Sequence, residues 1–249
     1  MSHMTKPVFA YLLLSEHPYG REMLRQILSE GFVPAIVITE DSAIGDEERE
    51  KFLARILGNP VAPTVSAQLA ELESAGISVP HVTVPIHNDE HCMGYIEGAE
   101  PELIVFGGTR IIRGAILEYG DARGGVLNAH PGLLPECRGS ASPAWSVYHD
   151  IPIGASCHFC STAIDAGDLA GRREIPVRRG ATYQDLCYAT LVEAARLMTK
   201  AVAAYADGRL DELRTPQGDS EWPTFRYDAE IERAAIAKLE RGEYGHYVD

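Results

Sequence analysis

Two polar residues near the middle of the chain have the types and the spacing for hydrogen-bond donation and proton transfer. Asn128 and His130 directly follow an apolar run and are separated by one residue. In extended backbone, residues two apart share a face, so an amide donor and an imidazole would point at one small volume. Pro131 restricts His130 to extended backbone angles and so fixes the direction of its side chain. A structural turn would use the same residue types, because Asn and Pro are common in loops.

Asp165 is a third candidate for chemistry. It stands in the stretch Ile164-Asp165-Ala166-Gly167, just after a strand-like segment. This places one carboxylate on a tight turn. The signal is weak on its own, because an Asp near a Gly is commonly a turn former whose side chain caps local N–H groups.

The remaining sequence predicts the framework that would position these side chains. Apolar runs predict strands at residues 8–14, 33–39, 79–86, 103–106, 124–128, 153–161 and 171–177. Helical spacing predicts helices at residues 23–28, 40–57, 65–75, 90–97, 183–207 and 229–241. This alternation is typical of an α/β domain with a mostly parallel sheet flanked by helices. Ligands bind such sheets outside the carboxyl ends of the strands, where Asn128 would open a long loop.

The stretch from Asn128 to about Val177 resembles the formyltransferase family that uses 10-formyltetrahydrofolate. That family includes glycinamide ribonucleotide transformylase, methionyl-tRNA formyltransferase and the formyltransferases of amino sugars and natural products. Its hallmark is an Asn-x-His-Pro-x-Leu-Leu-Pro loop and a later Asp-x-Gly, which match Asn128 to Pro135 and Asp165 to Gly167. The gap of 35 residues between His130 and Asp165 also fits, and His158 matches a family His.

The resemblance implies a Rossmann-like formyltransferase fold, with a catalytic domain at residues 5–213. Residues 214–249 would form a C-terminal extension that packs on the core or on a partner subunit. The resemblance also implies a folate site near the segment from Phe106 to Ile112, whose counterpart holds the pterin ring. The expected contacts to 10-formyltetrahydrofolate are Thr109, Arg110, Ile111, Ile112, Ser161 and Ile164.

The resemblance implies catalytic roles for the three candidates. An amine attacks the formyl carbon, and Asn128 and protonated His130 donate hydrogen bonds to the developing oxyanion. Asp165 holds a water molecule or His130 and helps to move a proton from the amine to the departing folate nitrogen. Arg138 and His17 are candidates for contacts to the acceptor, although a surface or carboxylate-paired Arg138 fits the sequence equally well.

Charge and length favour a small acceptor. The 249 residues carry 22 Lys and Arg against 36 Asp and Glu, a net charge of −14, which works against binding tRNA or an anionic membrane. The turn at residues 15–20 has Glu16 where glycinamide ribonucleotide transformylase would cradle a phosphate. We therefore expect a small amine, such as a nucleotide-linked amino sugar or a hydroxyornithine-type precursor, and no nucleic-acid or membrane partner. A methionyl-tRNA formyltransferase, a formyltetrahydrofolate hydrolase and a non-catalytic folate-binding module remain the alternatives.

Several other groups are expected to be structural. The pair Cys157 and Cys160 would point to opposite faces of a strand, and we expect no metal there. The polar cluster at residues 87–91 and the acids at residues 40–50 are interpreted as solvated, and Gly107-Gly108 lacks the spacing of a dinucleotide fingerprint. The aromatic patch at Trp222, Phe225 and Tyr227 would pack on the core or in a homodimer.

The sequence also bears on location. It has no apolar run of about 18 residues and no basic-then-apolar start typical of secretion. Its five Cys do not form a disulfide framework, so a cytoplasmic protein is expected. The first four residues, Met1 to Met4, are interpreted as a tag remnant.

Overall fold

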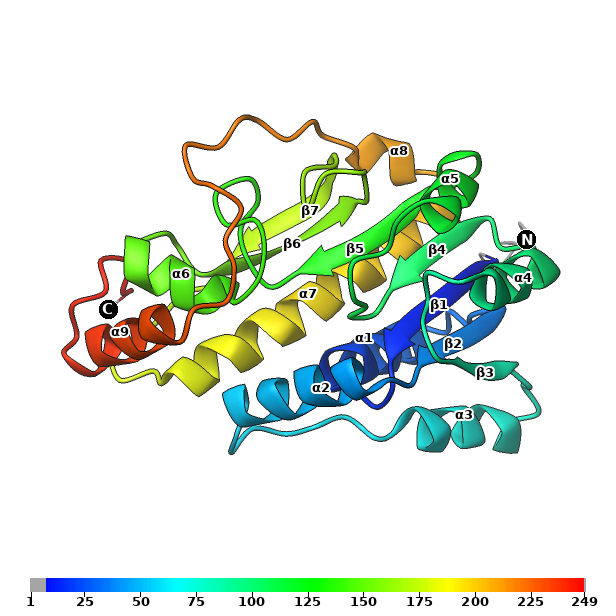
Figure 1. Cartoon of the computed structure of the whole chain (residues 1–249), viewed down its shortest axis with the longest axis horizontal. Helices are drawn as coiled ribbons and strands as arrows, with labels where there is room; N and C mark the ends of the chain where they lie inside the picture. Colours follow the sequence, from blue (N-terminus) through cyan, green and yellow to red (C-terminus); the bar gives the residue numbers. More distant parts are fainter. Residues whose placement is uncertain (1–7, 249) are drawn as a thin grey trace.

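A twisted sheet forms the centre of the computed structural model, which describes residues 8–248 (Figure 1). The tag-like residues Met1 to Met4 lie outside that range. Within it, the strand order is β3-β2-β1-β4-β5-β6-β7; β1 to β5 pair in parallel, and β6 and β7 pair antiparallel. The strands are β1 Phe9–Leu14, β2 Ile36–Glu40, β3 His81–Val84, β4 Leu103–Phe106, β5 Val126–His130, β6 Gly154–Phe159 and β7 Leu169–Glu174. The predicted α/β fold with a mostly parallel sheet is confirmed.

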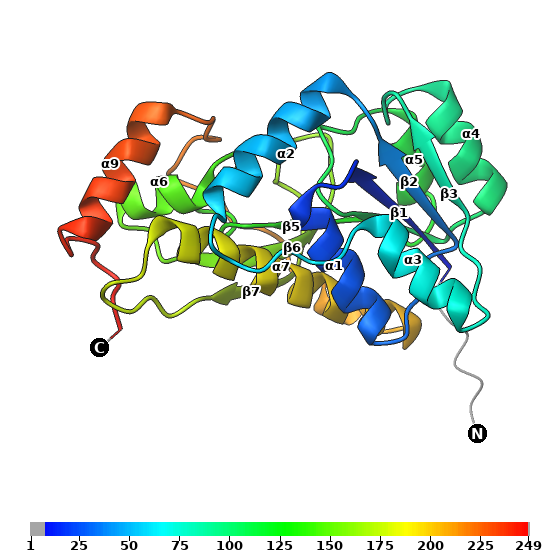
Figure 2. The same ribbon diagram turned by 90° about the horizontal axis from the view of Figure 1, so that it is seen from below.

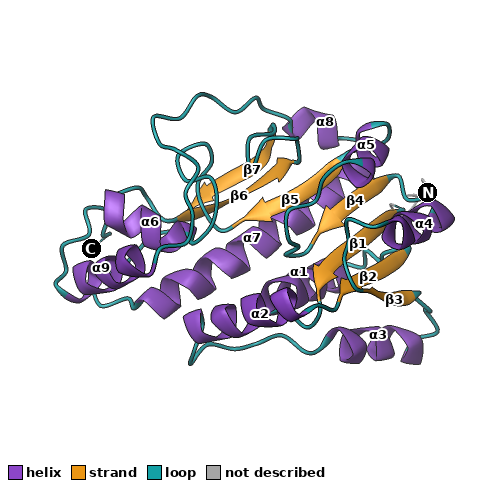
Figure 3. Ribbon diagram, in the orientation of Figure 1, coloured by secondary structure: helices purple, strands orange, loops and turns teal. Residues whose placement is uncertain are grey.

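Helices connect the strands and cover both faces of the sheet (Figures 2 and 3). Those that precede β6 are α1 Pro18–Ser29, α2 Ala43–Arg55, α3 Val65–Ser74, α4 Glu90–Ala99, α5 Ala115–Asp121 and α6 Ser142–His149. Those that follow β7 are α7 Tyr183–Ala206, α8 Leu210–Leu213 and α9 Ala229–Glu240. None of the helices in residues 8–248 combines the length and the apolarity that crossing a membrane requires.

The two faces of the sheet bury different side chains because neighbours along a strand point to opposite sides. Tyr11, Val105 and Leu127 face a large core made with α1 and α7. Leu12 and Val126 face a smaller core made with α4 and α5. Asn128 and His130 have the same parity as Val126, so they lie on the face that α7 does not cover.

The loop predicted after residue 128 differs from the structure in two ways. Asn128 and His130 are the third and last residues of β5, not the start of a loop. Helix α6 then forms at Ser142–His149 within the predicted loop. The sequence lacks the usual start signal for α6, because its N-cap is Ala141 at φ 60° with no side-chain capping hydrogen bond.

Residues 214–228 form a strap that runs from α8 to α9 over the edge of β6 and β7 (Figure 1). The strap pairs with the rest of the chain at both ends, through Thr215 with Leu169 and Phe225 with Gly139. Phe225 is buried in a small cluster with Cys137 and Ile151, against which Trp145 and Trp222 pack. The predicted aromatic patch therefore packs partly on its own chain, while Tyr227 stays exposed.

Candidate active site

The three residues predicted to do chemistry lie together at one point on the sheet. Asp165 Oδ2 is 3.5 Å from His130 Nδ1, and Asp165 Oδ1 is 3.5 Å from His158 Nε2. Asn128 Nδ2 is 3.2 Å from the same His158 nitrogen. Asn128 pairs directly with His158 across β5 and β6, which explains why their side chains meet.

The ring of His130 is held at Nε2 and faces a carboxylate at Nδ1. Its Nε2 is 2.7 Å from the carbonyl oxygen of Cys137 and 2.9 Å from the hydroxyl oxygen of Ser142. A carbonyl can only accept, so Nε2 carries a proton; this assignment follows from the network. Nδ1 faces the Asp165 carboxylate, which also only accepts when ionised. At 3.5 Å this contact is an ion-pair distance, longer than a good N–H···O hydrogen bond, so an Nδ1–H stabilised by the neighbouring carboxylate is still able to donate to an oxyanion.

His158 orients Asn128. Its Nδ1 lies 3.0 Å from the carbonyl oxygen of Phe159 and donates to it, so in the neutral ring Nε2 accepts a hydrogen from the Asn128 amide. The second Nδ2 hydrogen of Asn128 is left to donate to a ligand. His158 is 2% exposed and Asn128 is half-buried. The Asn128 amide is therefore held by a buried partner while part of it stays accessible to a ligand.

The carboxylate of Asp165 is fixed by its own backbone and by Gly139. Asp165 has φ 50°, a left-handed conformation, and the Gly139 N–H donates to its Oδ2 at 2.9 Å. A Cβ at Gly167 would collide with the carbonyl oxygen of Phe159, which explains the glycine two residues after the Asp. Burial alone would raise the pKa of Asp165, but the positive charge of a protonated His130 and the hydrogen bond from the Gly139 N–H hold it well below its usual value. Asp165 is therefore an anion at neutral pH.

Comparison with known proteins identifies the family. A profile of the Formyl transferase family matches residues 59–202, more than half of the chain, and the match includes Asn128, His130 and Asp165. The chain belongs to this formyltransferase family. It is therefore a formyl-transferring enzyme, as the sequence predicted.

Individual relatives support the family and leave the acceptor open. The chain is 27% identical over 230 residues to methionyl-tRNA formyltransferase from Bacillus cytotoxicus, covering 90% of this chain and 67% of that protein. The chain thus spans about two thirds of the length of this relative.

Solved structures share the fold. Glycinamide ribonucleotide transformylase 1 from Symbiobacterium toebii superposes with a TM-score of 0.60 at 22% identity, covering 82% of this chain and 90% of that one. A 4-N formyltransferase from Francisella tularensis superposes with a TM-score of 0.60 at 15% identity, covering 96% of this chain and 88% of that one.

The loops predicted to hold the folate lie beside the three candidate residues in this formyltransferase. Thr109 to Ile112 follow the carboxyl end of β4, the strand next to β5, and Ile112 is buried in the core with α4 and α5. Ile111 is 52% exposed and Ile164 43% exposed, and Ser161 is exposed as well. Contact of these exposed side chains with a folate stays a prediction.

Arg110 forms an ion pair with Glu40, which the sequence did not predict. Its Nη1 donates to Glu40 Oε1 at 3.2 Å, and the Glu40 side chain is 1% exposed. Glu40 also accepts from the Ser42 hydroxyl and from the backbone N–H of His87, both at 2.9 Å. The interpretation of Glu40 and His87 as solvated is therefore wrong, since both are buried. Burial alone would raise the pKa of Glu40, but the His87 side chain, whose Nδ1 lies 3.3 Å from Glu40 Oε2, and the hydrogen bonds from the His87 N–H and Ser42 lower it to about 2.

The two candidates for acceptor contacts have structural partners. Arg138 donates to Gln217 Oε1 at 3.0 and 3.3 Å and to the carbonyl oxygen of Gly218. His17 is the N-cap of α1, where its Nδ1 accepts from the backbone N–H of Tyr19. Burial, helped by the charges of Arg49 and Arg55, lowers the pKa of His17 to about 4, so it is uncharged at neutral pH. A role for either residue in acceptor binding stays a prediction.

The cysteine pair lies on opposite sides of the sheet. Cys157 belongs to the core with α7, and Cys160 packs against the core with α4 and α5. Burial raises the pKa of Cys157 to about 12, which disfavours the thiolate that a metal would need. Among residues 8–248, no three His, Cys, Asp or Glu side chains gather in a way that could hold a metal ion.

Proposed function

We propose that this enzyme transfers the formyl group of 10-formyltetrahydrofolate to the amino or hydroxylamino nitrogen of a small-molecule acceptor. The observation that carries the proposal is the convergence of Asn128, His130 and Asp165 on one point, where Cys137 and Ser142 hold His130 Nε2 and His130 Nδ1 faces the Asp165 carboxylate. Such an arrangement supplies two hydrogen-bond donors and one carboxylate without a nucleophilic side chain.

The residues present can carry each step of the reaction. The lone pair of the neutral acceptor amine adds to the formyl carbon, forming a C–N bond and an oxyanion. Asn128 and the cationic His130 donate hydrogen bonds to that oxyanion, and one such donor is worth roughly 3–4 kcal/mol of barrier. Asp165, an anion, takes up the amine proton directly or through water. The proton passes to the folate nitrogen as its bond to the formyl carbon breaks, which restores the carbonyl.

Three features of the structure support a small acceptor. The turn at residues 15–20 is a poor phosphate site, because the Glu16 carboxylate accepts from the backbone N–H of Val65 and pairs with Arg21. His17 in the same turn is uncharged. The net charge of −14 opposes the phosphate contacts that tRNA binding needs.

Fold coverage also favours this choice. The 4-N formyltransferase and a sugar N-formyltransferase from a Shewanella species match 96% and 93% of this chain, against 82% for glycinamide ribonucleotide transformylase 1. The larger coverage is in line with a small amine such as an amino sugar.

A panel assay tests the proposal. The enzyme is incubated with 10-formyltetrahydrofolate and, in separate reactions, amino-sugar nucleotides, hydroxyornithine-type amines, glycinamide ribonucleotide, initiator methionyl-tRNA, or no acceptor. We expect N-formylation of a small amine and no formylation of tRNA at physiological salt. Formylation of the tRNA, of glycinamide ribonucleotide alone, or release of formate without an acceptor would each overturn the choice of acceptor.

A further inference from the structure

We propose that Gln217, on the strap of residues 214–228, positions Asp165 for formyl transfer. The proposal rests on the proposed function, since it assigns Gln217 to the alignment of a residue that the mechanism uses. Gln217 does not touch the reacting atoms; it acts through the main chain of the Asp165 loop.

The side chain of Gln217 joins three parts of the chain. Its Nε2 donates to the carbonyl oxygens of Asp165 at 2.9 Å and of Gly167 at 2.5 Å. Its Oε1 accepts from Arg138 at 3.0 Å. The amide is half-buried, and all of its contacts are to residues within two positions of either Asp165 or Gly139.

Gln217 adds to the contacts that Gly139 and Phe159 make with the Asp165 loop. Residues 161–164, which lead into it, are exposed and lie outside any helix or strand. Asp165 itself adopts φ 50°, a conformation that is costly for a residue with a side chain unless its surroundings hold it. The two hydrogen bonds from Gln217 end on the carbonyl oxygens of Asp165 and Gly167. They therefore hold the main chain of the left-handed turn in place.

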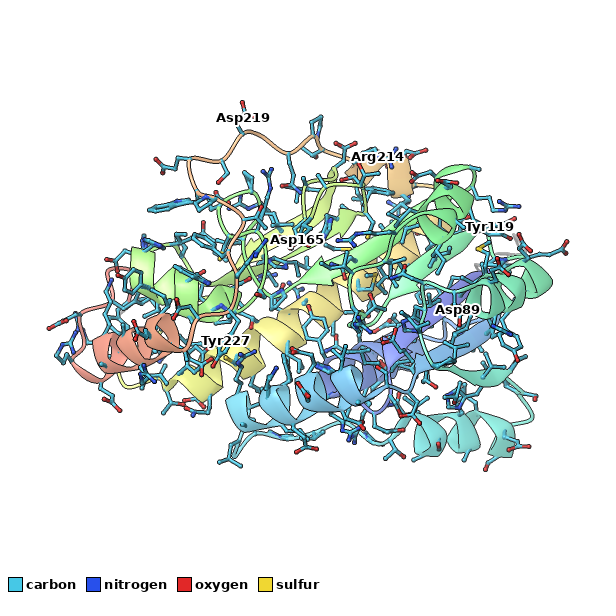
Figure 4. All side chains as sticks on the ribbon, in the orientation of Figure 1. Asp89, Tyr119, Asp165, Arg214, Asp219 and Tyr227 are labelled. Carbon is cyan, nitrogen blue, oxygen red and sulfur yellow. The ribbon has the colours of Figure 1, made fainter. Side chains whose placement is uncertain are left out.

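The strap is anchored well enough to act as a fixed support. On one side of Gln217, Thr215 exchanges two backbone hydrogen bonds with Leu169, at 2.7 and 2.9 Å. On the other side, the Phe225 N–H donates to Arg138 and its carbonyl oxygen accepts from Ser140, at 2.8 and 3.1 Å. Figure 4 shows the strap arching past Asp165, from Arg214 through Asp219 to Tyr227.

The same strap also fixes the partner of the carboxylate. Arg138 and Ser140, which pair with Phe225, flank Gly139, and the Gly139 N–H donates to Asp165 Oδ2. A Cβ at Gly139 would collide with the carbonyl oxygen of Phe225, so the two backbones are in close contact. The strap therefore fixes both the main chain of Asp165 and the Gly139 N–H, which donates to the Asp165 carboxylate.

Two substitutions test this role in the full chain. Gln217→Glu keeps the acceptor for Arg138 but turns the donor toward Asp165 and Gly167 into an acceptor; Gln217→Met removes all three contacts at similar size. Misplacement of a catalytic group by about 1 Å can cost about 100-fold in rate, so we expect kcat to fall about 10- to 100-fold in both variants. KM for 10-formyltetrahydrofolate should change by less than about threefold, because the loss is in alignment and not in binding. Asp219→Ala, an exposed residue of the same strap, is the control and should keep the kcat of the wild type.

The outcomes separate this proposal from the proposed function. Asp165→Asn is measured alongside with the acceptor found in the panel. If Asp165→Asn loses activity while both folded Gln217 variants keep wild-type kcat, the role of Gln217 is wrong and the mechanism stands. If Asp165→Asn keeps full activity, the mechanism itself is wrong. A crystal structure of Gln217→Glu is expected to show the Asp165 to His130 distance lengthened beyond 3.5 Å, and an unchanged distance contradicts the proposal. If one Gln217 variant does not fold, the other carries the test.

Discussion

Glu40→Gln should weaken the protein in a way that depends on pH. The Glu40 carboxylate is 1% exposed at the carboxyl end of β2, where it accepts hydrogen bonds from Ser42, His87 and Arg110. Its pKa falls from 4.5 to about 2 on folding, because the side chain and the backbone N–H of His87, with the Ser42 hydroxyl, outweigh the cost of burial. One pKa unit corresponds to about 1.4 kcal/mol, so the ionised carboxylate contributes about 3 kcal/mol to the free energy of unfolding at pH 7.

The sign of the pH dependence follows from the lowered pKa. The contribution is complete above the unfolded pKa near 4.5 and is lost as pH falls through the folded pKa near 2. At pH 3.5 about 2 kcal/mol should therefore remain, so the difference between wild type and Glu40→Gln narrows by about 1 kcal/mol. Urea unfolding at pH 7 and at pH 3.5, followed by circular dichroism, measures both differences.

Asp41→Asn is the matched control for this experiment. Asp41 is the next residue along the chain and is exposed, so its substitution should change the free energy of unfolding by less than about 0.5 kcal/mol. A Glu40→Gln cost below about 1 kcal/mol at pH 7, or an equal cost at both pH values, would refute the reasoning.

Two further substitutions test the geometry of the site. Ser142→Ala removes a hydroxyl that lies 2.9 Å from His130 Nε2. Loss of a buried hydrogen bond of about 1 kcal/mol corresponds to roughly a fivefold lower kcat, which steady-state kinetics measures. An unchanged kcat would mean that the Cys137 carbonyl alone orients the ring. Gly167→Ala places a Cβ against the carbonyl oxygen of Phe159 and should cost roughly 1–3 kcal/mol of stability in thermal unfolding, with loss of kcat. Gly218→Ala on the strap, where a Cβ would meet open space among the described residues, should be neutral, and equal effects of the two alanines would contradict the packing argument.

Local patterns in the sequence predicted the strands and most of the long helices, and they marked Asn128, His130 and Asp165 as candidates whose roles came from the family resemblance. Strand β4 falls at the predicted residues 103–106, because four apolar side chains between turn-forming residues leave few alternatives. Asn128 and His130 share a face because their spacing alone determines it. The motif spacing also paired His130 with Asp165, which the structure places 3.5 Å apart.

Local patterns could not predict side-chain partners that lie far apart in the sequence. Glu40 looked like one of a run of surface acids, because its partners His87 and Arg110 lie 47 and 70 residues further on. The available signal was its position at the carboxyl end of a buried strand, where the preceding apolar run ends. Gln217 lies 52 residues from Asp165, in a segment whose composition is typical of an exposed loop. Ser142 is the first residue of α6, a helix that was not predicted. The position of its hydroxyl near His130 could therefore not be predicted either.

We infer that His130, with Asn128 and Asp165, promotes the direct transfer of a formyl group from folate to a small amine. The most direct measurement follows a labelled formyl group in a single turnover, with wild type and with His130→Ala. We predict that the label appears on the acceptor nitrogen, and that His130→Ala slows its appearance at least about 100-fold, as expected for loss of an oxyanion donor. Transfer by His130→Ala at the wild-type rate, or label that appears only as formate, would contradict the account.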